Sequence, residues 1–133
     1  GYLGRYNNQI ALIPEGGDTR AFLGWMGWGK QLFSMLPVYA GHFTKKPFAM
    51  TTCNNGSDRA MVPIGMYEQV MPMDIEPTFL LRALLSNDIE RAEQLGCLEL
   101  AEEDVALCTY VCPSKHDYGI ALRDMLTRLE REG

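Results

Sequence analysis

Two cysteines near the end of the chain have the spacing of iron–sulfur ligands. Bacterial-type cluster-binding runs read C-x₂-C-x₂-C-x₃-C-P, and Cys108, Cys112 and Pro113 match the last five positions of that run. The first two ligands would stand at positions 102 and 105, where the chain has Glu102 and Val105. Two remaining thiols cannot hold a four-iron cluster. The pattern therefore indicates half of a cluster-binding run that no longer binds a cluster.

A related run lies 41 residues earlier in the chain, the offset from Tyr67 to Cys108. Identical residues at this offset include Val70 and Val111, Pro72 and Pro113, Leu81 and Leu122, and Arg82 and Arg123. The earlier run has apolar or aromatic side chains at the four ligand positions, namely Met61, Ile64, Tyr67 and Met71. Two-cluster ferredoxins contain two such runs, each leading into a helix, so the repeat predicts a duplicated ferredoxin-type module without clusters. We expect the loops 61–72 and 102–113 to superpose, with apolar side chains filling the former cluster volume as core.

The elements that carry these runs are expected to be helices. Pro77 suits the first position of a helix, and the leucines that follow form a one-sided stripe at 80, 81, 84 and 85. Asn87 and Glu90 have the spacing of a capping box, which predicts a short helix at 88–95. A third helix is expected at 102–111. Asp117 should cap a longer helix that follows it.

The first part of the chain has a different pattern. RYNNQIALIP contains β-type residues with Ile10 and Leu12 on one face, and a turn cluster follows at 15–18. TRAFLGWM could form the returning strand of a hairpin, and KKPFAMTT another short strand. We therefore predict an α+β chain, with a small β-rich region at 1–56 and a helical, degenerate ferredoxin-like module at 57–133.

Composition limits the classes of function. The chain has 133 residues, and its net charge of −5 argues against non-specific binding to nucleic acid. We find no apolar run long enough to span a bilayer and no signal peptide. Four cysteines in a chain of this size favour free thiols over disulfides. The start at Gly1, without methionine, suggests a piece of a longer protein.

Long strings along nearly the whole chain resemble one protein family. They are YLGRYNNQIALIPEG, NNGSDRAMVPIGMYEQVMPMDI, QLGCLELAEEDVALCTYVCPSKHDYG and the closing LTRLEREG. Their sequence is similar to the C-terminal part of the A subunits of bacterial Na⁺-translocating NADH:quinone reductases. The stretch GWMGWGKQLFSMLPVYAGHF departs mildly from the family pattern.

The resemblance implies membership of a six-subunit membrane complex that oxidises NADH, reduces ubiquinone and exports Na⁺. It implies a peripheral subunit on the cytoplasmic face of the bacterial inner membrane, held to the membrane only through partner subunits. NADH, flavins, iron centres and ubiquinone serve the complex, whereas this stretch is expected to carry no cofactor, no metal and no catalytic residue. The family is also similar to the iron–sulfur subunit of the Rnf electron-transfer complex, which keeps both cluster runs. Assembly and docking are the expected role, and a share in the ubiquinone-binding region is the alternative.

The residues leave room for three other sites. A zinc set of three thiolates and an imidazole would use Cys97, Cys108, Cys112 and His116, although no C-x₂-C knuckle is present. A loose group of aromatics with one polar anchor could line a quinone site, namely Trp25, Trp28, Phe33, Tyr39 and Lys30. Arg59 follows a loop and could contact a partner or an anion. Inert buried thiols, ordinary packing of aromatics and a simple surface charge are the respective alternatives.

Overall fold

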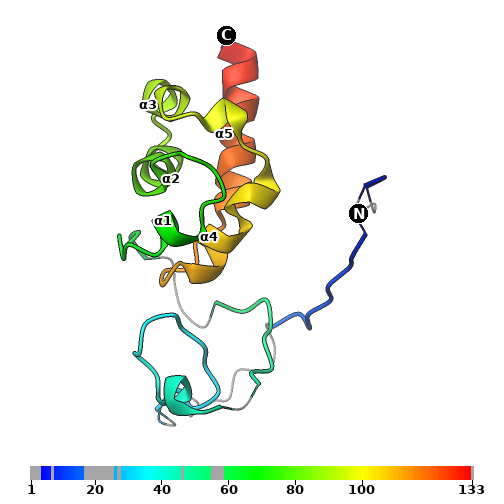
Figure 1. The fold of residues 1–133 in the computed structure, drawn as a ribbon, viewed down its shortest axis with the longest axis vertical. Helices are drawn as coiled ribbons and strands as arrows, with labels where there is room; N and C mark the ends of the chain where they lie inside the picture. Colours follow the sequence, from blue (N-terminus) through cyan, green and yellow to red (C-terminus); the bar gives the residue numbers. More distant parts are fainter. Residues whose placement is uncertain are drawn as a thin grey trace. The chain divides into compact units, whose positions relative to one another are not determined.

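The chain divides by its contacts into two units, Gly1–Asn55 and Gly56–Gly133. Figure 1 shows the computed structural model, in which each unit is described by itself. The described residues are 4–6, 8–16, 26, 28–45, 47–54 and 59–132.

The second unit is helical. Its elements in chain order are α1 (Tyr67–Val70), α2 (Pro77–Ser86), α3 (Ile89–Gln94), the 3₁₀ turns η3 (Cys97–Glu99) and η4 (Glu102–Val105), α4 (Ala106–Val111) and α5 (Tyr118–Glu132). The long helix α5 packs against α2, α4 and η4, while α3 packs against α2 and η3 (Figure 1). No helix among the described residues has the length and apolar character needed to cross a membrane.

The hydrophobic core of the described residues lies entirely in this unit. Its side chains are Tyr67, Leu80, Leu81, Ala83, Leu84, Ala92, Cys97, Leu100, Val105, Cys108, Val111, Cys112, Tyr118, Leu122 and Met125. The buried residues of α5 are spaced by four and then three positions, which places them on one face of the helix. The helical second half predicted from the sequence is therefore confirmed, and α2 begins at Pro77 as expected.

The junction between α2 and α3 differs from the predicted capping box. Asn87 is the residue after α2, with a left-handed φ of 55°, and its N–H bonds the carbonyls of Ala83 and Leu84. Asp88 caps α3 instead, because its Oδ1 accepts the backbone N–H of Arg91 at 3.2 Å. Asparagine tolerates the left-handed conformation better than most residues, so it suits the end of one helix while the neighbouring aspartate starts the next.

Replacing Asp88 by alanine should lower the free energy of unfolding of the helical unit by about 1 kcal/mol, because α3 loses its side-chain cap. Glu90→Ala is the matched control. Its side chain is exposed and caps nothing in the described structure, so we expect a change of only a few tenths of a kcal/mol. Urea unfolding followed by circular dichroism measures both variants. A larger loss for Glu90→Ala than for Asp88→Ala would favour the capping box predicted from the sequence.

The predicted β-rich region at 1–56 is wrong. The described part of this unit contains no strand, and its regular element is the 3₁₀ helix η2 (Ala40–Phe43). A strand needs a partner for its backbone groups and a face to bury. The expected first strand has neither, since Ile10 and Leu12 are 66% and 90% exposed. Most of the expected returning strand lies outside the described residues.

Candidate functional site

The two cluster-like loops end in the same backbone conformation. Helix α1 ends before Met71 and α4 ends before Cys112. The φ and ψ angles are −68° and 123° at Met71, and −60° and 121° at Cys112. Met71 donates its N–H to the Tyr67 carbonyl at 2.9 Å, and Cys112 donates its N–H to the Cys108 carbonyl at 3.0 Å. These matching ends agree with the repeat predicted from the sequence.

The helices that follow the loops also correspond. Helix α2 begins at Pro77 and α5 at Tyr118, which keeps the 41-residue offset. Buried residues occupy matching positions in the two helices: Pro77 and Tyr118, Leu81 and Leu122, and Leu84 and Met125. Helix α1 packs against α4, and α2 packs against α5. The helical unit is thus built from two related halves that share one core.

The ligand positions can be grouped by the rule for two-cluster ferredoxins, in which the fourth cysteine of each run binds the cluster of the other run. The first degenerate site then consists of Met61, Ile64, Tyr67 and Cys112. The second degenerate site consists of Glu102, Val105, Cys108 and Met71. Each site has one thiol, whereas a four-iron cluster takes four thiolates, so neither set of residues fits a cluster.

Three buried side chains join the two loops at the first degenerate site. The Tyr118 hydroxyl lies 3.2 Å from the Tyr67 hydroxyl and 3.4 Å from the Cys112 sulfur. The two phenol rings meet edge to face with their centroids 6.0 Å apart. All three side chains are fully buried. We call these residues the tyrosine–thiol cluster. Because it links α1, α4 and α5, it crosslinks both halves of the repeat through a polar contact within the core.

Cys112 has the surroundings of a thiolate rather than of an apolar thiol. Burial opposes ionisation, but hydrogen bonds from the hydroxyls of Tyr118 and Tyr67 and from the backbone N–H groups of His116 and Ser114 outweigh it and lower its pKa. The other two buried thiols behave oppositely. Burial raises the pKa of Cys108 to about 11 and also raises the pKa of Cys97. Cys112 is therefore the buried thiol of this unit with donors arranged around its sulfur.

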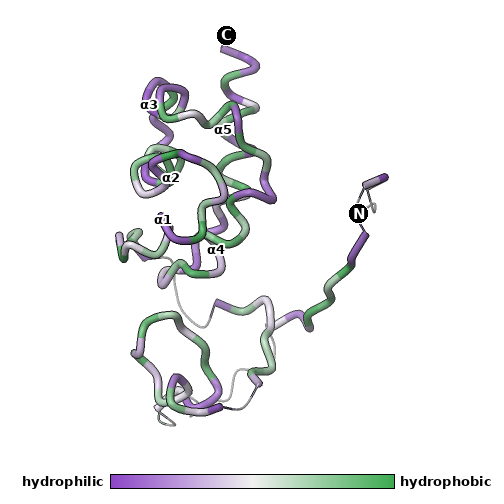
Figure 2. Tube along the Cα trace, viewed as in Figure 1, coloured by the Kyte–Doolittle hydropathy of each residue, from purple (hydrophilic) through white to green (hydrophobic). Residues whose placement is uncertain are grey.

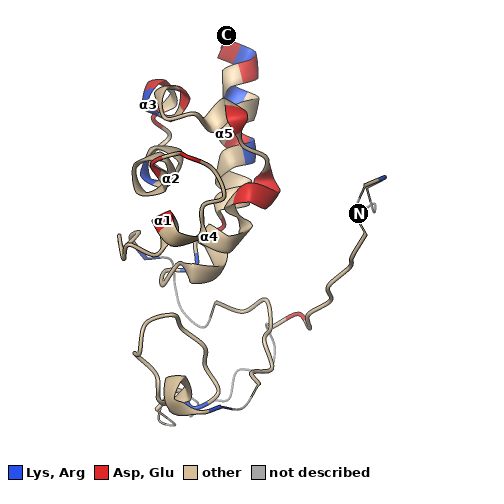
Figure 3. Ribbon diagram, viewed as in Figure 1, with Lys and Arg blue, Asp and Glu red and all other residues tan. Residues whose placement is uncertain are grey.

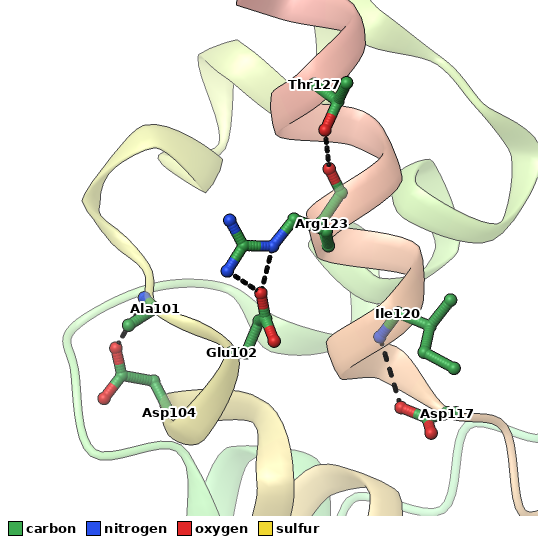
Figure 4. A network of polar contacts seen from close by, with 7 residues as sticks. All are labelled: Ala101, Glu102, Asp104, Asp117, Ile120, Arg123 and Thr127. Carbon is green, nitrogen blue, oxygen red and sulfur yellow. Dashed lines mark hydrogen bonds and ion pairs between the residues drawn. The ribbon is translucent and has the colours of Figure 1, made fainter. Parts of the chain in front are cut away.

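The second degenerate site has no such network. The Glu102 carboxylate forms an ion pair with Arg123 of α5, with contacts to Nε and Nη2 of the guanidinium (Figure 4). Both side chains are partly exposed, so the carboxylate faces the surface. Val105 and Cys108 are fully buried and fill this site as core side chains. This is packing and surface pairing, without an arrangement for metal binding or catalysis.

The apolar replacements fill the core less completely than the sequence predicted. Met61, Ile64 and Met71 are half-buried, and the buried volume is taken instead by Tyr67 and by Tyr118. Sequence reasoning missed Tyr118. A tyrosine directly after the capping residue Asp117, at the start of an apolar helix face, was the available signal, and the cap itself is confirmed because Ile120 donates its N–H to Asp117 Oδ1 at 3.2 Å.

The zinc set considered from the sequence is not assembled. In the part of the chain that the structure describes, no three histidine, cysteine, aspartate or glutamate side chains are grouped so that they could hold a metal ion. Acidic residues do gather at η4, where Glu102, Glu103 and Asp104 follow one another (Figure 3). There the Asp104 carboxylate accepts the backbone N–H of Ala101 at 2.8 Å (Figure 4), which explains it as a helix-start contact.

The other predicted site residues are dispersed or lie outside the described residues. Arg59 is exposed. Trp25 is not among the described residues, and Trp28 is 81% exposed. Phe33 packs on Phe48 with ring centroids 5.6 Å apart. A quinone site at these aromatics therefore stays a prediction.

Known proteins similar to the chain are A subunits of one respiratory enzyme. The A subunits of the Na⁺-translocating NADH-quinone reductases of Vibrio anguillarum and of Klebsiella pneumoniae are each 56% identical to it over 133 residues. The corresponding protein of Pasteurella multocida is 54% identical over 132 residues. No protein-family model matches the chain.

The match covers 99% of this chain but only about three tenths of each relative, namely 30%, 30% and 29% of their lengths. The matched segment is the C-terminal part of the relatives. The resemblance inferred from the sequence is thereby confirmed: along nearly its whole length, this chain is similar to the C-terminal part of the A subunits of the Na⁺-translocating NADH-quinone reductases.

Proposed function

We propose that this chain serves assembly and docking in a Na⁺-translocating NADH-quinone reductase and performs no redox chemistry itself. It would act at the cytoplasmic face of the membrane, through other subunits of the complex that couples NADH oxidation and quinone reduction to Na⁺ export. The single observation that carries the proposal is 56% identity to a named component of that enzyme over 99% of the chain.

The structure of the two degenerate sites supports the non-redox part of the proposal. Each site has one thiol, and Tyr67 and Val105 occupy ligand positions as fully buried side chains. Neither phenol nor aliphatic side chains are the thiolate ligands that iron–sulfur clusters use. The positions that would carry electrons in a ferredoxin are thus part of a packed core.

Exposed apolar side chains on α4 support the docking part. Leu107 and Tyr110 lie three positions apart on this short, largely apolar helix (Figure 2), and they are 55% and 42% exposed. A leucine and a tyrosine on one exposed face are typical of residues that become buried at protein interfaces. The Lys115 ammonium lies 5.6 Å from the centre of the Tyr110 ring, so a positive charge borders this face.

Assembly of the whole enzyme tests the docking role. The protein is produced together with the remaining subunits, and the complex is purified through a tag on one of those partners. Leu107→Glu should reduce retention of the protein about tenfold, because a charge buried against a partner costs about 1.4 kcal/mol or more, roughly the energy of a tenfold change. Arg128→Glu, at an exposed position of α5, is the control and should be retained normally.

Two outcomes would contradict the docking role of this face. One is normal retention of both Leu107→Glu and Tyr110→Glu, provided that circular dichroism shows them folded. The other is equal loss of the Arg128→Glu control, which would show that any added negative charge on the unit disturbs assembly. Retention of the control with loss of both α4 variants supports the proposal.

A further inference from the structure

The first degenerate site is held together by contacts between the two loops. The Ser114 hydroxyl donates to the Ala60 carbonyl at 2.6 Å, which joins the start of the first run to the residues after Cys112. The Tyr67 hydroxyl is also 3.5 Å from the Val62 carbonyl. The backbone around positions 61 and 64 therefore lies against the same segment of chain that carries Cys112.

The ligand positions of this site come from both loops, as the crossed arrangement of two-cluster ferredoxins requires. Tyr67 stands at the third ligand position of the first run, and Cys112 stands at the fourth position of the second run. Their side chains hydrogen-bond each other. The phenol ring of Tyr67 thus extends through the space between its own backbone and the Cys112 sulfur.

The sulfur of Cys112 keeps the donors that a metal-bound thiolate needs. Backbone N–H groups of Ser114 and His116, which follow Pro113, point to it. Hydrogen bonds to ligand sulfurs are one of the means by which proteins stabilise iron–sulfur clusters. An inert thiol in a hydrophobic core has no need of them. Backbone path and donors thus survive at this position, although three of the four ligand side chains have changed.

We propose that the first degenerate site is a latent iron–sulfur site, in which Tyr67 and Tyr118 do the crosslinking of a lost cluster, and that cysteines at positions 61, 64 and 67 would bind a four-iron cluster together with native Cys112. The ligand set crosses between the loops and leaves out Cys108, which belongs to the second degenerate site. The inference concerns this chain's backbone and Cys112, and it does not depend on the docking role.

The test uses the full chain with Met61→Cys, Ile64→Cys and Tyr67→Cys combined. This triple variant is incubated without oxygen with ferric iron, sulfide and excess dithiothreitol, both from the folded state and during refolding from urea. We expect about four irons and about four acid-labile sulfides per chain, with a visible charge-transfer band. Refolding is included because binding of a metal centre can itself drive folding, so a variant that is unfolded before loading still gives an answer.

Two further variants test the crossed ligand set. Adding Cys112→Ser to the triple variant should abolish stoichiometric iron and sulfide, whereas adding Cys108→Ser should leave both unchanged. The opposite result, or no stoichiometric cluster under either loading procedure, would overturn the proposal. The unaltered chain, treated in the same way, should stay colourless. A cluster in the unaltered chain would contradict the non-redox part of the proposed function, whereas the docking role is tested separately by assembly.

Discussion

Replacing Tyr118 by alanine is expected to lower the free energy of unfolding of the helical unit by about 3 to 5 kcal/mol. The ring is fully buried, so its removal leaves a cavity at the start of α5 and exposes the core between α4 and α5. It also takes the hydrogen-bond partner from the Tyr67 hydroxyl and from the Cys112 sulfur. Urea unfolding followed by far-ultraviolet circular dichroism measures the change.

Tyr118→Phe separates the ring from the hydroxyl. It keeps the buried ring but leaves two buried polar groups without this partner, which should cost about 1 to 3 kcal/mol. Tyr110→Ala is the control for loss of a tyrosine ring, since Tyr110 is 42% exposed and should cost about 1 kcal/mol or less. A Tyr118→Phe variant as stable as the original chain would show that the tyrosine–thiol cluster contributes packing and no net polar stabilisation.

The helices could be predicted because their signals are local. Pro77 starts α2 and Asp117 caps α5, and both positions follow from residues within one turn. The Asn87–Asp88 pair could be misread because both residue types cap helices. Only the backbone shows that Asn87 adopts a left-handed conformation after α2 and leaves the cap of α3 to Asp88.

The first unit and the tyrosine–thiol cluster depend on contacts far apart in the sequence. A β-type pattern such as that around Ile10 becomes a strand only when a second segment pairs with it, and periodicity does not supply that partner. The repeat located Tyr67 and Cys112 at ligand positions. It could not show that Tyr118, six residues beyond Cys112, would bring its hydroxyl between them. Buried polar networks are set by tertiary packing, so the sequence pattern alone leaves them undetermined.

The buried phenols and Cys108 should make the helical unit sensitive to alkali. Burial raises the pKa of Tyr67 and of Tyr118 above the ordinary phenol value of about 10, and it raises the pKa of the Cys108 thiol to about 11. Cys112 acts in the opposite direction. Its lowered pKa adds stability that is complete above the ordinary thiol value and is lost as the pH falls, so it adds no pH dependence in alkali.

The sign of the effect follows from the protons bound in each state. Above about pH 10 the unfolded chain releases the protons of all three groups, whereas the folded unit still holds those with raised pKa. The stabilisation is therefore complete below the unfolded values and is lost as the pH rises through the higher folded values. Each retained proton steepens the loss by about 1.4 kcal/mol per pH unit, so three groups give about 4 kcal/mol per pH unit.

The free energy of unfolding, measured in urea at steps between about pH 8 and about pH 11, should therefore fall slowly at first and steeply near the upper end. Tyr118→Phe removes one of the three ionising groups, so its curve should start lower but fall less steeply, by about 1.4 kcal/mol per pH unit. Tyr110→Phe removes a partly exposed phenol and should keep the original slope. Equal alkaline slopes for Tyr118→Phe and the unaltered chain would contradict the argument, because the Tyr118 hydroxyl would then not be held protonated by its burial with Tyr67 and Cys112.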